Sequence, residues 1–311
     1  MYVSINTIKI KTRNLYIDGS NLLHRAHWVS KSTKTSPIHI FLSSIRKYVN
    51  QFHTTELYLL WDGRRDVETI NHRHELLGSE YKGNRDKEKS AEVFRNVPYI
   101  DDITSCLGIR NLYPNILEAD DIIAWLCTKK FPTSHGVVVT TDKDLLQLVS
   151  QYIEVYNPIK DQIISTDNFK HIVGVDIDMF IAYKSILGDK SDNIDGIPAV
   201  GPKRALAMLE SFPESIPEGY QELYDRNVKL MDLDYSLSIN ESEQAYLQSH
   251  LSDIESRSEI DISKFEKRCK YFNLVTVINN MHDWKSMFDR EKQSKHLCNL
   301  ISSMDFSAGF E

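Results

Sequence analysis

The chain has 311 residues, of which 41% are hydrophobic and 26% are charged, a balance typical of an ordinary globular protein. A chain of this length can bury one large domain, or a main domain with a smaller appendage. It has no signal-peptide pattern and no run of about 18 apolar residues, so we expect a soluble, cytoplasmic protein. The four cysteines lie far apart in sequence, which argues against a zinc site or a disulfide framework.

Charge is distributed unevenly along the chain. The net charge of −7 by itself argues against a nucleic-acid partner, because phosphate binding usually requires a basic surface. Residues 1–90, however, hold 15 Lys and Arg against 9 Asp and Glu, a net charge of +6 that leaves −13 for the remainder. This distribution suits an enzyme that binds phosphates with one surface and metal ions with another.

Three short apolar segments are predicted to be buried strands, and an aspartate follows each. Helical patterns between them predict an α/β fold with a mostly parallel central sheet flanked by helices. Function in such sheets collects beyond the carboxyl ends of the strands, so we expect the aspartates to share one site. The segments and their acids are Leu15–Ile17 with Asp18, Leu57–Trp61 with Asp62, and Val137–Thr140 with Asp142.

The segment 64–95 is densely charged and holds few large apolar residues, which predicts a solvent-exposed excursion from the core. From about residue 178 the chain is predicted to become helical, so we divide it into an α/β core of residues 1–177 and a helical region of residues 178–311. The helical region is predicted to hold helices over 179–187 and 203–212 around the turn GIPAVGP, with Pro202 opening the second helix, and amphipathic helices around 219–232 and 264–290.

Nine acidic residues form the main candidate site. Magnesium prefers oxygen ligands, and a two-metal phosphodiesterase needs many carboxylates around one cavity. Helix capping or turn formation remains an alternative for the acids that stand near predicted helix ends. Asp18 and Asp62 are harder to explain in that way, because a charge next to a buried strand needs a partner. The nine are Asp18, Asp62, Glu118, Asp120, Asp121, Asp142, Asp144, Asp189 and Asp192.

A series of motifs from residue 14 to residue 212 resembles the 5′-nuclease family, which includes flap endonucleases, phage exonucleases of RNase H type and the N-terminal nuclease of bacterial DNA polymerase I. The segment 223–235 resembles phage members, and a phage-encoded enzyme would act in the host cytoplasm. The motifs are NLYIDGSNLLHRAH (14–27), LLWDG (59–63), RHEL (73–76), YKGNRD (81–86), LEADDIIAWL (117–126), TTDKDLLQLV (140–149) and ILGDKSDNIDGIPAVGPKRALAML (186–209).

The resemblance implies a structure-specific 5′-nuclease with two Mg²⁺ ions, for which Mn²⁺ is an expected substitute. It implies cleavage of DNA flaps, nicked or free 5′ ends and RNA–DNA primers during replication, with 5′-phosphate and 3′-hydroxyl products. Asp18 and Asp142 are then expected to be essential for catalysis. The resemblance assigns the first metal to Asp18, Asp62, Glu118 and Asp120, and the second to Asp142, Asp144, Asp189 and Asp192, with Asp121 adjoining.

The same resemblance implies which residues contact DNA. Segment 64–95 would form a helical arch, in which Lys82 and Arg85 act on the scissile phosphate and Tyr81 stacks on a base. Residues 178–212 would form a helix–three-turn–helix that binds duplex DNA, sometimes with a K⁺ ion. Without the resemblance, Lys82 and Arg85 could also be ordinary solvated surface charges. The expected DNA contacts are Arg73, Tyr81, Lys82, Arg85, Gly196, Gly201, Lys203 and Arg204.

Two other functions would also use part of this pattern. A PIN-domain ribonuclease has related acids at its sheet, but such domains are usually shorter and lack both the arch motif and the duplex-binding hairpin. A noncatalytic DNA-binding scaffold has no use for nine acids facing a polyanion, since without metals they would repel it. The C-terminal residues 299–311 are a candidate docking segment for a sliding clamp or a single-strand-binding protein, with packing onto their own domain as the alternative.

Overall fold

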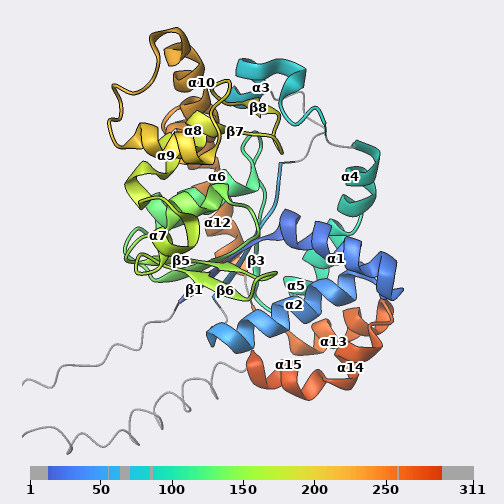
Figure 1. Cartoon of the computed structure of the whole chain (residues 1–311). Helices are drawn as coiled ribbons and strands as arrows, with labels where there is room; N and C mark the ends of the chain where they lie inside the picture. Colours follow the sequence, from blue (N-terminus) through green and yellow to red (C-terminus); the bar gives the residue numbers. More distant parts are fainter. Residues whose placement is uncertain (1–12, 55, 64–70, 85–86, 258, 289–311) are drawn as a thin grey trace, which may run out of the picture.

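The computed structural model of the chain describes residues 13–54, 56–63, 71–84, 87–257 and 259–288. Its centre is a six-stranded sheet with the order β3-β2-β1-β4-β5-β6 (Figure 1). Strands β1 to β5 are parallel, and β6 runs antiparallel to β5, which confirms the predicted fold class. The strands are β1 Asn14–Asp18, β2 Leu57–Leu60, β3 Arg110–Leu112, β4 Gly136–Val139, β5 Ile153–Asn157 and β6 Gln162–Ile164.

The three predicted strands are the central ones, β1, β2 and β4. Every residue of β2 and β4 is buried, and so is every residue of β1 after Asn14. Strands covered on both faces read as continuous apolar runs, which is why the sequence revealed them. β3 and β6, with three residues each, were too short to be recognised, and β5 carries polar residues at Glu154 and Asn157.

One face of the sheet is covered by helices from both ends of the chain. The C-terminal helices α13 to α15 pack against α2 and α5, so that Phe265 and Trp284 are buried in the same core as Phe41 of α2 (Figure 1). These C-terminal helices therefore belong structurally to the α/β core. The helices on this face are α1 Gly19–Thr33, α2 Pro37–Phe52, α5 Val97–Thr104, α13 Ile262–Tyr271, α14 Val275–Asn279 and α15 Met281–Met287, and α4 Lys87–Phe94 packs on α1.

The other face is covered by helices that surround α6. Helix α6 is followed there by a π-helical turn, η2. Ile122, Ile123 and Leu126 are buried against the sheet and against Leu237 and Leu247. This face holds α6 Ala119–Trp125, η2 Leu126–Lys130, η3 Asp144–Leu148, α7 Phe169–Val173, α11 Leu233–Ser238 and α12 Glu241–Arg257.

A helical unit stands beyond the carboxyl ends of the strands. Its two predicted helices are present, although the second ends at Leu209, before the predicted 212. Gly196 cannot carry a side chain, because a Cβ there would lie 2.2 Å from the carbonyl group of Leu187. The buried Asn227 amide donates to the carbonyls of Ser185 in α8 and Asp195 in β8, which ties α10 to both elements. The unit consists of η4 Ile177–Met179, α8 Phe180–Leu187, β7 Gly188–Asp189, β8 Ile194–Asp195, α9 Pro202–Leu209, η5 Glu218–Tyr220 and α10 Gln221–Met231.

The described parts of segment 64–95 are mostly exposed, as predicted, but a few of their residues are buried. His72 and Arg73 are buried in α3 (His72–Leu77), which packs against α10 and leads into η1 (Gly78–Glu80). Tyr81 and Val93 are also buried. The charges of Arg73 and Lys82 are paired with acids at the start of α6 rather than solvated, which the charged composition of the segment could not show. No helix in the described ranges is long and apolar enough to span a membrane.

Candidate active site

Asp18 and Asp62 lie at the carboxyl ends of the central strands β1 and β2. Asp18 is only 7% exposed and accepts hydrogen bonds from the Asn21 amide at 2.9 Å and the Thr140 hydroxyl at 3.1 Å. Burial, together with the nearby charges of Asp62 and Asp142, raises the pKa of Asp18 to about 7. The three predicted strand-end aspartates therefore share one site, in which negative charge is not fully compensated.

Glu118 and Asp120 stand at the N-terminus of α6, beside the strand ends. Asp62 accepts a hydrogen bond from the Ala119 amide at 3.1 Å, which holds the first turn of α6 against β2. Burial and the charge of Asp121 raise the pKa of Asp120 well above its ordinary value. Burial would also raise the pKa of Glu118, but Lys82 and Arg73 hold it below its ordinary value. Helix capping does occur at the N-terminus of α6, but it explains only part of the negative charge that the acids bring to this turn.

The remaining acids come from two separate parts of the chain. Asp142 and Asp144 follow β4, whereas Asp189 lies in β7 and Asp192 in the turn after it. Lys184 of α8 forms ion pairs with Asp144 and Asp189, the latter at 2.6 Å. Burial alone would raise the pKa of Asp189, but Lys184 lowers it to about 2. Burial raises the pKa of Asp144, and Lys184 opposes this rise. The charges of Asp189 and Asp192 raise the pKa of Asp144 further, so the two pairs of acids lie together.

Lys82 lies between the two groups of acids. Its ammonium group is 2.7 Å from Glu118 and 4.0 Å from Asp192, and its backbone amide donates to the Asp192 carbonyl at 3.1 Å. Burial by itself lowers the pKa of Lys82, but Glu118 raises it well above its ordinary value, so the side chain remains charged. Lys82 thus contacts Glu118 and Asp192, and Lys184 pairs with Asp144 and Asp189. Eight of the nine predicted acids are connected to one another, because Asp18 interacts electrostatically with Asp62 and Asp142, Asp142 with Asp144, and Asp120 with Glu118.

The ninth acid, Asp121, and two expected DNA contacts have different surroundings. Asp121 is fully buried, and both of its oxygens accept hydrogen bonds from Arg73 at 2.8 Å. Tyr81 is 4% exposed and donates its hydroxyl hydrogen to Glu118 at 2.9 Å. Its ring contacts His74 at one edge and the ammonium group of Lys82 at 4.9 Å. Neither Arg73 nor Tyr81 therefore has a free polar group or ring face for DNA in this structure, because their side chains are used inside the protein.

The expected duplex-binding hairpin is on the surface. Gly201 precedes α9, and Lys203 and Arg204 in the first turn of that helix are exposed, so their charges are accessible to a phosphate. Ala199 in the turn adopts a left-handed backbone conformation with φ of 59°. The predictions for Arg85 and for the C-terminal segment 299–311 fall outside the described residues.

Sequence reasoning missed two charged residues that hold the site. Lys184 sits five residues before Asp189 in a helical pattern, and nothing local marks it as a partner of Asp144. The buried Glu243 of α12 accepts hydrogen bonds from the amides of Asn115 and Ile116, just before Glu118. A buried acid that satisfies backbone amides of a distant loop leaves no signal in sequence spacing, so only the fold could reveal it.

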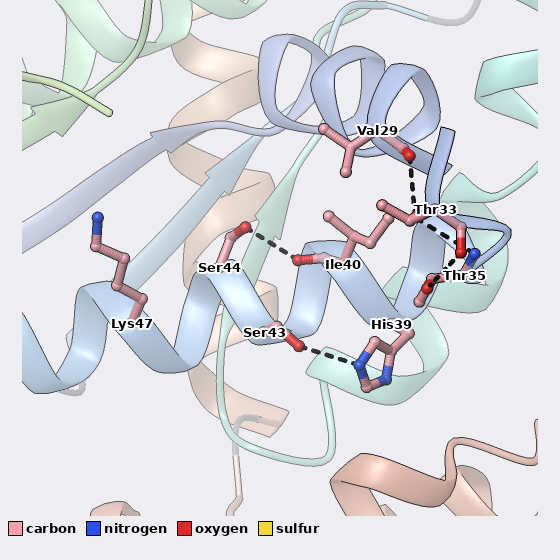
Figure 2. A pocket seen from close by; sticks show the side chains of 8 residues that line it. All are labelled: Val29, Thr33, Thr35, His39, Ile40, Ser43, Ser44 and Lys47. Carbon is pink, nitrogen blue, oxygen red and sulfur yellow. Dashed lines mark hydrogen bonds between the residues drawn. The ribbon is translucent and has the colours of Figure 1, made fainter. Parts of the chain in front are cut away.

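A shallow pocket of about 380 Å³ lies between α1 and α2, and none of these acids lines it (Figure 2). Its hydroxyl groups bond within their own helices, as when Thr33 donates to the Val29 carbonyl and Ser44 to the Ile40 carbonyl. It therefore offers few converging polar groups and no acidic ones, and we place the chemistry at the strand ends instead. The pocket is lined by Val29, Thr33, Thr35, His39, Ile40, Ser43, Ser44 and Lys47.

The donor set at the strand ends fits divalent metal ions by its chemistry. Carboxylate oxygens are the ligands that Mg²⁺ and similar cations prefer, and the raised pKa of Asp18 indicates a need for further positive charge. As the described side chains stand, no three acids, histidines or cysteines form a ready-made cage. Lys82 and Lys184 occupy part of the space between the acids. Acids gathered at the carboxyl ends of a parallel sheet are the arrangement of a metal-dependent phosphodiesterase.

Comparisons with known proteins agree with this class. The family model described as "5'-3' exonuclease, N-terminal resolvase-like domain" matches residues 13–174, and "5'-3' exonuclease, C-terminal SAM fold" matches residues 175–274. A 5'-3' exonuclease of Aquifex aeolicus is 30% identical over 253 residues, covering 75% of this chain and 86% of the relative. The chain therefore belongs to the 5′-3′ exonuclease family and is a nuclease of the flap endonuclease and 5′→3′ exonuclease type.

Two further similarities support that assignment. A flap endonuclease Xni of Shewanella loihica is 29% identical over 204 residues, covering 64% of this chain and 77% of the relative. Among solved structures, the T5 D15 protein co-crystallised with metal ions has a TM-score of 0.65 and 25% identity, covering 79% of this chain and 100% of that chain. The family and fold that the sequence motifs resembled are thus confirmed.

Proposed function

We propose that the chain cleaves DNA by a two-metal mechanism, with Mg²⁺ as the working ion and Mn²⁺ as a substitute. The observation that carries this proposal is that Lys82 contacts Glu118 of one set of acids and Asp192 of the other. Asp18, Asp62, Glu118 and Asp120 would hold one ion, and Asp142, Asp144, Asp189 and Asp192 the other. Such ions supply a nucleophilic hydroxide and neutralise the charge of the scissile phosphate.

The chain's own residues would then orient the phosphate. Lys82 is held by its backbone amide on the Asp192 carbonyl, so its ammonium group is fixed between the two acidic groups. A positioned cation stabilises charge that develops in the transition state more than it strengthens binding of the ground state. Arg85 is proposed to assist. The products would be a 5′-phosphate and a 3′-hydroxyl.

The proposed substrates are duplexes with a 5′ flap, a nick or a free 5′ end, and RNA–DNA primers. Support comes from the hairpin, where the backbone amides at the start of α9 and the exposed Lys203 and Arg204 offer a phosphate site. A K⁺ ion bound by carbonyls of residues 196–201 is part of this proposal. We also propose a nuclease core of residues 1–177 and a DNA-binding region that begins at 178, of which helices α13 to α15 pack back on the core. The C-terminal residues 299–311 would add a docking segment for a sliding clamp or single-strand-binding protein.

The test offers four 5′-labelled substrates to the purified chain: a flap, a nicked duplex, an RNA–DNA hybrid and a single strand. Each is incubated with Mg²⁺, with Mn²⁺ and with EDTA, and the product ends are identified by phosphatase treatment and by ligation. We expect cleavage of the first three with either metal and none in EDTA. Cleavage in EDTA would exclude the metal mechanism. A chain that cuts only the single strand would contradict the proposed substrate class.

A further inference from the structure

Arg73 joins three segments that are far apart in sequence. Its guanidinium group makes a forked pair with Asp121 of α6, with both nitrogen–oxygen distances at 2.8 Å, and one of its nitrogens also lies 3.4 Å from Glu118. Its remaining nitrogen, Nε, donates to the Leu230 carbonyl of α10 at 3.0 Å. The arginine side chain is 3% exposed and that of Asp121 is 0% exposed. All three guanidinium nitrogens are therefore engaged inside the protein.

The two ends that Arg73 joins are electrostatically complementary to it. Leu230 is in the last turn of α10, where carbonyls lack partners within the helix and the helix dipole favours a cation. His72, the preceding residue, lies 3.1 Å from the Lys229 carbonyl and so occupies a second of these groups. On the other side, Asp121 and Glu118 stand at the positive N-terminus of α6 and supply the compensating negative charge.

Asp121 carries this arrangement to the acidic site. The same oxygen that accepts from Arg73 also accepts from the backbone amide of Glu118 at 3.0 Å. The orientation of the first turn of α6, and with it the direction of Glu118 and Asp120, therefore depends on the Arg73–Asp121 pair. Groups that orient metal ligands from behind typically change metal affinity or activity about 10- to 100-fold when they are removed.

We propose that Arg73 is a positioning residue, which acts through Asp121 to set the metal-binding turn of α6 and locks that turn to the C-terminus of α10. Asp121 then serves as the partner of Arg73, not as a metal ligand. The inference rests on the proposed metal site. It replaces the sequence-based expectation that Arg73 contacts DNA and Asp121 adjoins the metal.

The test compares the double variant R73Q/D121N with R204Q at the hairpin. The double variant removes one positive and one negative charge and leaves two amides that can bond to each other, so no buried charge is left unpaired. DNA affinity is measured in EDTA across a KCl titration. The Mg²⁺ dependence of the melting temperature and of single-turnover cleavage is measured separately. The wild-type chain in the same cleavage assay tests the proposed function by itself.

For R73Q/D121N we expect an unchanged DNA Kd and salt slope in EDTA, and a rise of about tenfold in the Mg²⁺ concentration at half-maximal melting shift and cleavage. R204Q should show the reverse, with weaker DNA binding, a salt slope reduced by about one, and an unchanged Mg²⁺ dependence. The proposal is overturned if R73Q/D121N behaves like R204Q, or if its Mg²⁺ dependence equals that of the wild type. If the double variant does not fold, R73K is used instead, because it keeps the positive charge but cannot form the two-bond pair with Asp121. The same two outcomes would then overturn the proposal.

Discussion

The two groups of acids differ in how they are assembled. Asp18, Asp62, Glu118 and Asp120 all lie within residues 13–174, at the ends of two adjacent strands and the start of one helix. The second group combines Asp142 and Asp144 from that region with Asp189 and Asp192 from residues 175–274. All four acids of the first group therefore come from the region of the sheet, although Arg73 also links their α6 turn to α10, whereas the second group takes two of its acids from the helical unit itself.

That difference is visible in the contacts that hold each group. Local hydrogen bonds at the strand ends fix Asp18 and Asp62, through Asn21, Thr140 and the first turn of α6. In the second group, Lys184 bridges Asp144 and Asp189 across the two regions. The comparison teaches that metal binding at the proposed second site would depend on the docking of the region proposed to bind duplex DNA.

The largest effect is expected for Asp18→Asn, which removes a negative ligand from the ion proposed to supply the nucleophile. Single-turnover cleavage in Mg²⁺ should fall by orders of magnitude. Flap binding in Ca²⁺ or EDTA should remain. Near-wild-type cleavage across a Mg²⁺ titration would remove Asp18 from the metal site, and joint loss of binding and of folded signal would make it a structural residue.

Asp142→Asn tests the second group in the same assays. Cleavage should again fall by orders of magnitude, because charge stabilisation by the second ion is weakened. DNA binding without metal should be preserved or improved, since one repulsive charge has been removed from a site that meets a polyanion. Retained cleavage at all Mg²⁺ concentrations would contradict the assignment of two ions.

Lys82→Ala tests the cation that lies between the two groups, and Arg85→Ala tests its proposed helper. Both should slow single-turnover cleavage much more than they weaken flap binding, because a positioned cation acts on transition-state charge. Flap affinity in Ca²⁺ is measured beside the rate for each variant. Rates within about twofold of the wild type would show that neither cation is needed for the chemistry.

The smallest effect is expected for Lys184→Met, which leaves Asp144 and Asp189 without their shared cation. The metal-free protein should lose on the order of 1–3 kcal/mol of unfolding free energy, since two partly buried carboxylates lose a charged hydrogen-bond partner. Saturating Mg²⁺ should recover much of this loss, because the ion supplies positive charge at the same acids. Urea unfolding with and without Mg²⁺ measures the loss of unfolding free energy and its recovery. An equal loss of unfolding free energy under the two conditions would argue against metal binding at Asp144 and Asp189.

Several features of this protein were determined by local sequence. Continuous apolar runs identified β1, β2 and β4, because a strand buried on both faces carries apolar residues at nearly every position. Asp18, Asp62 and Asp142 could be assigned to one site, since parallel strands end at the same edge. The turn at 196–202 and the start of α9 at Pro202 followed from the conformational limits of glycine and proline.

Only the tertiary structure decided which charges are paired and buried. Arg73 and Leu230, like His72 and Lys229, are 157 residues apart in the chain, and their contact depends on the packing of α3 against α10. Segment 64–95 reads as solvated because its composition is charged, yet Arg73, Tyr81 and Lys82 find partners on α6. The apolar residues that a segment will bury are part of its own sequence, so local patterns reveal them. A buried ion pair, in contrast, depends on where a distant segment places the opposite charge.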